Sequence, residues 1–463
     1  MKGLFIISGL GILAMLAEIF KFKKALYPIV LVGVLAAYVC NLMEWGQNNM
    51  SIPMFNNMIA FNDLSLAFSG VILITLFFWF ILANDYFEHD HITDHFALVL
   101  FAVVGALMLT SFKNMTTLFL GIEILSIPMY VLAASRKRDL ASNEAGFKYL
   151  IMGSFASGFL LFGIALIYGA TGSFDLMEIR SYISHSQGTM PLFFYAGILM
   201  ILVAMCFKVS AAPFHFWAPD VYEGSPTVIT ALMSTIVKTA AFAAFMQLFL
   251  IVFGKTNETW SLVLSIIIAL SLIVSNITAA SQHSVKRMLA YSSISHAAFM
   301  LMAILANAKG FASVNAILYY SLAYSIGSIA AFTVVYNVSK TNDNTGLDAF
   351  DGLSKRNPLM AFCMLIAMLS LAGIPVTAGF FAKYFVFTTL IGTPYKWLLV
   401  LAILTSAVGV YYYFKVIIAM YFKKPHHEEK FAIETSHVLL LVLTTLFTIA
   451  LGLVPNYVID IFG

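Results

Sequence analysis

Residues 191–214 read PLFFYAGILMILVAMCFKVSAAPF. The stretch is long enough to cross a bilayer, because about 20 apolar residues of helix span the hydrocarbon core. Two of its residues are nevertheless costly at that depth, since Lys208 is charged and Pro213 removes an amide donor and interrupts a helix. We therefore predict a membrane helix that is broken near Pro213, where the freed backbone lines a polar cavity or is buried in protein.

A second stretch repeats this pattern 167 residues later in the chain. Pro358-Leu359 opens it, as Pro191-Leu192 opens the first, and the match continues to 376–381. Residues 290–294 match 120–124 more loosely. We therefore predict two copies of one five-helix unit. Because five is an odd number, the copies are expected to be inverted relative to each other, as in many secondary transporters.

Along the chain, the lysine lies before the break in the first repeat and after the break in the second. Lys208 precedes Pro213, whereas Lys383 follows the break at Gly373-Ile374-Pro375. In the frame of the repeat, Lys383 is displaced by eight positions from Lys208, which is about 12 Å along a continuous helix. We therefore expect a shared scaffold in which the two charges lie at different depths.

The composition is that of a membrane protein. Hydrophobic residues make up 61% of the 463 residues and charged residues only 10%, whereas soluble domains carry about 25% charged residues. Cys40, Cys206 and Cys363 occur singly, without a CxxC pair, which argues against a disulfide framework and against an iron–sulfur or zinc site. We expect an all-α polytopic membrane protein without a redox centre of its own.

Apolar runs predict about fourteen transmembrane helices. We place them at 3–20, 25–43, 63–84, 95–112, 115–134, 144–170, 190–218, 225–252, 259–281, 285–306, 311–338, 357–391, 394–422 and 435–462. They form four regions: the first three helices in 1–94, the two repeats in 95–252 and 259–422, and the last helix in 423–463.

The charges of the loops predict the orientation of these spans. Loops after odd-numbered spans hold fourteen Lys and Arg residues, and loops after even-numbered spans hold five, including Lys309. The positive-inside rule therefore places the odd-numbered loops, including Lys430, in the cytoplasm and both termini in the periplasm. The loop 85–91 is acidic although it belongs to the cytoplasmic set, but acidic residues carry little weight in this rule. We expect the chain to lie in the inner (plasma) membrane of a bacterial cell.

Several ionisable residues lie within the predicted spans, where a lysine at the centre costs about 2.5–3.5 kcal/mol. They are Glu123, Lys148, Lys208, Lys238 and Lys383. A chain that accepts this free-energy cost at several positions is expected to use the charges, which indicates a path for protons or ions. Structural roles remain open for each of them: Glu123 could be capped locally, Lys148 could extend to the cytoplasmic surface, and Lys383 could lie nearer to the interface.

Three further residues have two interpretations each. His215 and His296 are candidate relay members, or else histidines whose hydrogen bonds serve only the structure. Lys415 also lies within a predicted span and is either a further charge of the path or an interfacial anchor beside the aromatic run 411–414, and we favour the anchor.

The stretch Ala212–Thr227, APFHFWAPDVYEGSPT, resembles the hallmark sequence of subunit N of NADH-quinone oxidoreductase. That family is one of the three antiporter-like subunit families of respiratory complex I. The resemblance extends to 121–130, 144–149 and 284–293, and thus over essentially the whole chain.

The resemblance implies a role for each buried charge. Glu123 and Lys208 would form a charge pair that Lys148 modulates, and Lys238 would connect two half-channels. Lys383 would deliver protons to the outer side. The first repeat would form the proton input half-channel and the second the output half-channel.

The function implied is proton translocation coupled to quinone reduction elsewhere in a complex. NADH or another donor, FMN, iron–sulfur clusters and quinone are expected in partner subunits, and sister antiporter-like subunits and membrane lipids are expected as neighbours. Two alternatives share the fold: an Mrp-type Na⁺/H⁺ antiporter subunit, and a membrane subunit of a related hydrogenase or other donor-linked complex. A scaffold without transport is a third, but it would not need charges in two inverted copies.

Overall fold

The computed structural model describes residues 1–46, 52–86, 92–186, 190–307, 312–342, 344–425, 433–456 and 458. Contacts divide the chain into two compact units. Unit 1 contains Met1–Phe77, Asp85–Ser210 and Ile236–Leu264, and unit 2 contains Phe78–Asn84, Ala211–Thr235 and Ser265–Gly463. This division is a different partition from the two repeats expected at 95–252 and 259–422, which stay a prediction.

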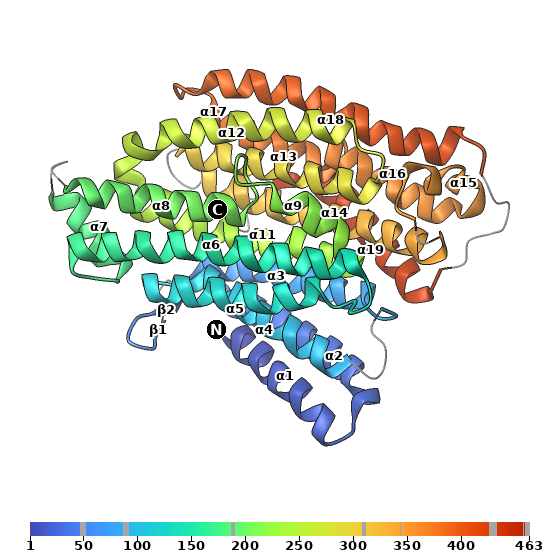
Figure 1. Cartoon of the computed structure of the whole chain (residues 1–463), viewed down its shortest axis with the longest axis horizontal. Helices are drawn as coiled ribbons and strands as arrows, with labels where there is room; N and C mark the ends of the chain where they lie inside the picture. Colours follow the sequence, from blue (N-terminus) through green and yellow to red (C-terminus); the bar gives the residue numbers. More distant parts are fainter. Residues whose placement is uncertain are drawn as a thin grey trace. The chain divides into compact units, whose positions relative to one another are not determined.

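Unit 1 is built mainly of long apolar helices (Figure 1). Its elements are α1 (Lys2–Ile19), α2 (Lys23–Met43), the antiparallel hairpin β1 (Ile52–Met54) and β2 (Ile59–Phe61), most of α3 (Asp63–Leu82), α4 (Ile92–Ser111), α5 (Met115–Ala133), α6 (Leu140–Thr171), α7 (Leu176–His185), α8 (Leu192–Lys208), α11 (Lys238–Met246), the π-helical turn η2 (Gln247–Val252), the 3₁₀ turn η3 (Gly254–Thr256) and the start of α12 (Asn257–Ala280).

Small residues allow the helices of unit 1 to approach closely. The chain packs α4 against α1 and α5, and α6 against α5 and α8. A Cβ atom at Gly105 of α4 would come within 2.4 Å of the backbone nitrogen of Leu125 on α5. At the other contact, a Cβ at Gly197 of α8 would meet the carbonyl oxygen of Gly163 on α6 at 3.0 Å. Glycine at such positions is typical of packed membrane helices.

Unit 2 is arranged around α14, which packs against five other helices of the described part of the chain. Its elements are α9 (Trp217–Gly224), α10 (Thr227–Leu232), the rest of α12, α13 (Val285–Ala306), α14 (Ala312–Asn342), the 3₁₀ turn η4 (Leu347–Phe350), α15 (Leu353–Arg356), α16 (Pro358–Ala372), α17 (Ala378–Leu390), α18 (Lys396–Phe422) and α19 (Thr435–Leu453). The helical neighbours of α14 are α10, α13, α16, α17 and α19. A π-helical turn, η1 (Met233–Val237), continues α10 along the chain toward α11.

The predicted spans correspond closely to the helices observed. Among the described residues, twelve helices are long and apolar enough to cross a membrane. Three shorter apolar helices, α8, α16 and α17, lie in the two spans that were predicted to be broken. The chain is thus a multi-pass membrane protein, but the predicted count of fourteen spans is not confirmed. The hairpin, α7 and α9 were not predicted, since they are short and carry no long apolar run.

Contacts within unit 1 agree with the predicted alternation of its loops. Thr93, in the loop after the third predicted span, donates a hydrogen bond of 2.8 Å to Glu18, which lies at the end of the first span beside the loop that follows it. In the even-numbered set, Lys255 donates to Ser184 at 3.1 Å. Each contact therefore joins two loop regions that are expected on the same side of a membrane.

Unit 2 shows the same agreement. Lys423 forms an ion pair with Asp351 at 3.3 Å, and the hydroxyls of Ser284 and Thr345 lie 3.1 Å apart. All four residues belong to odd-numbered loops. Lys309, Lys430 and residues 87–91, which also entered the orientation argument, lie outside the described residues.

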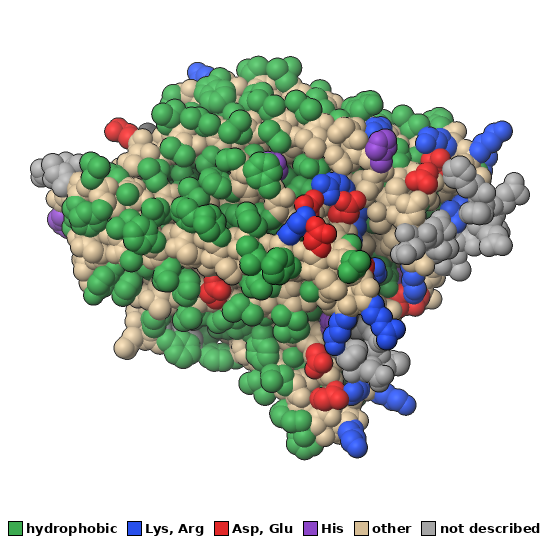
Figure 2. All heavy atoms as spheres, in the orientation of Figure 1, with side chains coloured by type: hydrophobic (Ala, Val, Ile, Leu, Met, Phe, Trp, Pro, Cys, Tyr) green, Lys and Arg blue, Asp and Glu red, His purple; other side chains and the backbone are tan. Residues whose placement is uncertain are grey.

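The surface has the character expected of a protein embedded in lipid. On the face drawn in Figure 2, hydrophobic side chains predominate and charged side chains are few. Large apolar side chains on α6 and α12, among them Phe155 at 64% and Leu262 at 65%, are well exposed. Surfaces this apolar are unusual for soluble monomers, so we attribute them to contact with lipid or neighbouring membrane proteins.

Candidate functional site

Serine hydroxyls hold the first pair of predicted charges. Lys208 is the last residue of α8 and is only 9% exposed. Its ammonium donates a hydrogen bond to Ser126 on α5, and Ser126 donates in turn to the carbonyl of Ile122. Glu123, one turn before Ser126, accepts a hydrogen bond from Ser157 on α6. Within the described part of the chain, no direct ion pair joins Glu123 to Lys208. The carboxylate and the ammonium are each bound to a serine instead.

A small cavity lies between α5, α6 and α8 where these groups converge. Its lining includes Lys208 and Ser157, so the hydroxyl that binds Glu123 and the ammonium share one space. Two tyrosines also line it, Tyr130 and Tyr149, whose rings pack edge to face with their centroids 4.7 Å apart. The cavity therefore has an ammonium and hydroxyl groups in a mainly apolar lining, and such polar partners are what water requires inside an apolar bundle.

Lys148 lies on α6 and forms an ion pair with Glu144, one turn earlier on the same helix, at 2.6 Å. The lysine side chain is 39% exposed and the glutamate side chain 64% exposed. The structure therefore does not bring Lys148 into the cavity with Lys208. Its position in the third turn of α6 agrees with a side chain that reaches toward the end of the helix.

Lys238 is the first residue of α11 and is 2% exposed. The π-helical turn η1 immediately precedes it. Single π turns inside longer helices occur frequently at functional sites, because the extra residue re-aims the side chains that come after it. Lys238 is thus a deeply buried cation at an irregular point of its helix.

The helix that contains Pro213 is interrupted as its sequence indicates. Helix α8 ends at Lys208, and α9 begins only at Trp217. Ser210 lies in the left-handed region with φ 63°. The amide of Ala212 donates a 2.8 Å hydrogen bond to Ser271, so a side chain of α12 satisfies part of the freed backbone.

His215 lies in this same interruption. The residue is 6% exposed, and its Nδ1 is buried without a hydrogen-bond partner. Buried polar atoms are normally paired. This Nδ1 is an exception, and it therefore offers a free bonding position for water or a proton.

The second interruption has a similar construction. Helix α16 ends at Ala372 and α17 begins at Ala378, with Pro375 between them. Val376 has φ 75°, which is a strained value for a β-branched residue. The amide of Gly379 donates to Ser370 at 3.1 Å, and a Cβ at Gly379 would come within 1.8 Å of the carbonyl of Ser370.

Lys383 reaches back across this interruption. It is 8% exposed, and its ammonium donates a 2.8 Å hydrogen bond to the carbonyl of Ala372, the last residue of α16. The ammonium also lies 5.2 Å from the centroid of the Phe299 ring. Cations at a helix C-terminus satisfy carbonyls that have no partner in the helix. The position of Lys383 is therefore defined by the end of α16 rather than by its own helix alone.

A hydrogen-bonded chain of side chains surrounds His296 on α13. Its Nδ1 lies 2.6 Å from the hydroxyl of Tyr320, and its Nε2 lies 3.1 Å from the hydroxyl of Tyr413. Tyr413 is hydrogen-bonded in turn to Ser292. A cavity lined by His296, Tyr320 and Ala382, the residue before Lys383, adjoins this chain. Among the two candidate histidines, His296 is thus the one with polar partners on both ring nitrogens.

Lys415 does not face this network. Its ammonium donates to the carbonyl of Ala280, the last residue of α12, at 3.1 Å and lies 5.8 Å from the centroid of the Tyr411 ring. The anchor predicted beside an aromatic run therefore also caps a helix.

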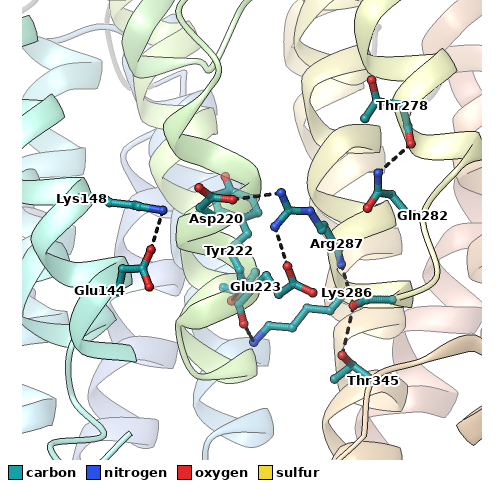
Figure 3. Close-up of polar contacts among 12 residues, drawn as sticks. Glu144, Lys148, Asp220, Tyr222, Glu223, Thr278, Gln282, Lys286, Arg287 and Thr345 are labelled. Atoms are coloured by element: carbon teal, nitrogen blue, oxygen red, sulfur yellow. Dashed lines mark hydrogen bonds and ion pairs between the residues drawn. The ribbon is translucent and has the colours of Figure 1, made fainter. Parts of the chain in front are cut away.

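A cluster of charges joins the start of α13 to α9 (Figure 3). Arg287 binds Asp220 at 2.9 Å and Glu223 at 2.5 Å. Lys286 is 5% exposed and donates to the carbonyls of Glu223, at 3.0 Å, and Ser225. From the sequence, Lys286 and Arg287 were interpreted only as loop cations. Two acidic residues in one family motif and two adjacent cations in another were the signal that could have revealed this pairing.

Comparisons with known proteins now place the chain in a family. Residues 113–409 match the family model described as "NADH:quinone oxidoreductase/Mrp antiporter, TM". The chain is 42% identical to NADH-quinone oxidoreductase subunit N of Flavobacterium psychrophilum over 463 residues, and the alignment covers 100% of both chains. It is 45% identical to the subunit N of Cytophaga hutchinsonii, over 91% of this chain and 90% of that one. The chain belongs to the NADH-quinone oxidoreductase subunit N family. It is therefore an antiporter-like, proton-translocating membrane subunit of complex I, as the resemblance predicted.

Solved structures agree with this membership. A chain of respiratory complex I from Thermus thermophilus is 31% identical, with a TM-score of 0.83 over 99% of this chain and 98% of that one. The archaeal membrane-bound sulfane sulfur reductase and the Mrp complex of Dietzia each reach a TM-score of 0.87, at 23% and 18% identity. The last two show a shared fold alone. The sequence relatives, and not the fold, decide between the subunit N interpretation and the two antiporter-fold alternatives.

Proposed function

We propose that protons cross this subunit along Glu123, Lys208, Lys238 and Lys383, in that order. Lys148, paired with Glu144, would tune the input side from the third turn of α6. The first repeat would provide the input half-channel and the second the output half-channel. Quinone reduction elsewhere in the complex would drive the transfer.

The observation that carries this proposal is the buried lysine at each helix interruption. Lys208 ends α8 and is bound to a hydroxyl, and Lys383 is bound to the end of α16. Burial favours the neutral form of a lysine, whereas a neighbouring carboxylate favours the charged form. Glu123 and Lys208 are bound to two different serines and not to each other. A small movement of α5 against α8 would therefore change the distance between them and hence the proton affinity of Lys208.

The polar chain at His296 supports an exit path in unit 2. Hydroxyls and a neutral imidazole can each accept a proton on one side and donate on the other. Tyr320, His296 and Tyr413 are connected in this way at 2.6 Å and 3.1 Å. We include them as exit-side carriers next to Lys383. His215, with its unpaired Nδ1, is a candidate carrier at the first interruption.

The remaining partners follow from the chemistry that this chain does not provide. Its three cysteines are free and do not form a cluster motif, so we place FMN and iron–sulfur clusters in partner subunits, together with the sites for NADH and quinone. Sister antiporter-like subunits and lipids would surround the apolar helices. On the basis of the loop charges, we place the chain in the bacterial inner membrane with both termini in the periplasm.

The proposal is tested with Lys208→Ala and Glu123→Ala in the assembled complex. Electron transfer from the soluble donor to an artificial acceptor is expected to persist, because it does not require this subunit's charges. Quinone-coupled pumping into sealed vesicles is expected to fall sharply. Normal pumping by both variants would refute the relay, and loss of assembly at normal expression would assign these residues a structural role.

A further inference from the structure

Lys286 and Arg287 differ from ordinary cations at a membrane boundary. A boundary lysine usually extends its ammonium into water or toward lipid head groups. Lys286 is instead 5% exposed, and its ammonium binds two backbone carbonyls of the same segment, those of Glu223 and Ser225. These carbonyls lie at the C-terminal end of α9, where a helix leaves acceptors without partners. The lysine thus completes the end of α9.

Arg287 fixes the same helix through its side chains. Its two terminal nitrogens bind Asp220 and Glu223, which lie three residues apart and therefore on one face of α9. The planar guanidinium matches two carboxylates at once, which a lysine does not do. The Arg287 side chain is 28% exposed, so part of the cluster is screened by solvent. Figure 3 shows both carboxylates directed at one guanidinium.

Two more hydrogen bonds hold the turn between α9 and α10. Thr230 donates from its hydroxyl to the carbonyl of Tyr222 at 2.8 Å, which ties the first turns of α10 back to α9. Trp79 donates from its indole to the carbonyl of Val228 at 2.8 Å. The turn is therefore fixed from α13, from α10 and from the end of α3.

This turn connects two parts of the chain that carry candidate proton carriers. After it, α10 begins at Thr227, continues through η1, and reaches Lys238 as the first residue of α11. Before it, α9 comes directly after the interruption that contains His215. A displacement of α9 would thus alter both the backbone at the interruption and the start of the helix that carries Lys238.

We propose that Lys286 and Arg287 are positioning residues for proton transfer, which hold the turn between α9 and α10 so that Lys238 is correctly placed. This inference rests on the proposed function, since it acts through Lys238. Neither residue needs to exchange a proton itself. Displacing a reacting group by about 1 Å costs up to about 100-fold in rate, so a loosened turn is sufficient to slow transfer.

The test uses the assembled complex in sealed vesicles. Arg287→Met removes both ion pairs while keeping a long side chain. Arg287→Lys keeps the positive charge but not the planar guanidinium that binds two carboxylates at once. Lys355→Met, an exposed cation of the neighbouring predicted cytoplasmic loop, is the matched control. We expect Arg287→Met to lower quinone-coupled pumping about tenfold, with normal amounts of complex and normal electron transfer to an artificial acceptor. Arg287→Lys should be intermediate.

A charge swap separates positioning from a general structural role. In Arg287→Glu with Glu223→Arg, the new arginine faces both Asp220 and the new glutamate, so we expect most of the pumping to return. The proposal would be overturned if Arg287→Met pumped as fast as the control Lys355→Met, or if the charge swap did not restore pumping. If Arg287→Met does not assemble, Arg287→Lys decides: reduced pumping at normal abundance supports the proposal, and wild-type pumping overturns it. Lys238→Met is measured in parallel, because normal pumping there would refute the relay itself.

Discussion

The ammonium of Lys383 donates a 2.8 Å hydrogen bond to the carbonyl oxygen of Ala372, the last residue of α16. Lys208 is itself the last residue of α8. Each interrupted helix thus has a lysine at the C-terminal end of its first half, although the two lysines lie eight positions apart in the frame of the repeat. The expected difference of about 12 Å in depth assumed a continuous helix. The chain leaves the helical path between Gly373 and Thr377, so sequence spacing alone does not give the depth of Lys383, and the difference in depth stays a prediction.

We predict that Ser126→Ala lowers quinone-coupled pumping while the complex assembles normally. The substitution removes the hydroxyl that accepts a hydrogen bond from the ammonium of Lys208. A hydrogen bond to a charged group contributes about 1.5–3 kcal/mol, so the protonation equilibrium of Lys208 should change. The measurement is the initial rate of vesicle acidification at matched complex abundance. Ser184→Ala, at an exposed position of α7, is the control, and identical rates for the two variants would contradict the role assigned to Ser126.

A pair of glycines on α6 tests the cavity beside Lys208. A Cβ at Gly153 would come within 2.1 Å of the Tyr130 hydroxyl, whereas a Cβ at Gly158 has no atom within 4 Å. We predict that Gly153→Ala displaces Tyr130, changes the lining of the cavity and reduces pumping. Gly158→Ala, the same substitution on the same helix, should have no effect. Equal activity of both variants would show that the cavity does not contribute to transfer.

The sequence was sufficient to predict the helices and the two interruptions. Long apolar runs determine where spans lie, and Pro213 and Pro375 lie in the observed breaks because proline lacks an amide donor. Single short elements were missed. Helix α9, eight residues long, was not predicted. Its first two residues fall at the end of the span 190–218 and the other six in the loop before the next span, because its boundaries depend on contacts with α13 rather than on its own composition.

The hydrogen bonds of the site could not be predicted in the same way. The sequence places Glu123 and Lys208 in separate spans, but the serines that bind them, Ser126 and Ser157, depend on how α5, α6 and α8 are rotated against one another. Hydroxyls are common in membrane helices, so no local pattern singles these out. The same applies to Tyr320 and Tyr413, which meet at His296 from α14 and α18.

The chain of hydroxyls at His296 leads to a third prediction. Tyr320→Phe and Tyr413→Phe each remove one hydroxyl bound to the imidazole and leave the ring in place. We expect each to slow pumping, because a proton passing through His296 then loses one of the two hydroxyl groups bound to the ring. Tyr411→Phe is the matched control, since Tyr411 lies on α18, as Tyr413 does, but is 59% exposed. Wild-type pumping in both test variants would remove this chain from the exit path.

The last prediction separates two roles that Lys383 combines. As a cap it must donate a hydrogen bond to Ala372, and as a proton carrier it must be able to lose its proton. Lys383→Arg keeps a cationic donor that stays protonated in proteins. Lys383→Glu keeps a titratable group but bonds the carbonyl only when protonated, and a carboxylate is unfavourable at a helix C-terminus. Lys383→Met provides neither function.

If Lys383 carries protons, the glutamate variant should pump more than the methionine variant, and the arginine variant should pump as poorly as methionine despite normal assembly. If Lys383 only caps α16, the order reverses, and arginine should be the best of the three. Pumping in sealed vesicles, normalised to complex abundance and to electron transfer to an artificial acceptor, distinguishes the two orders. Equal pumping by the wild type and the methionine variant would exclude both roles as necessary for transfer, because that side chain neither donates to Ala372 nor titrates.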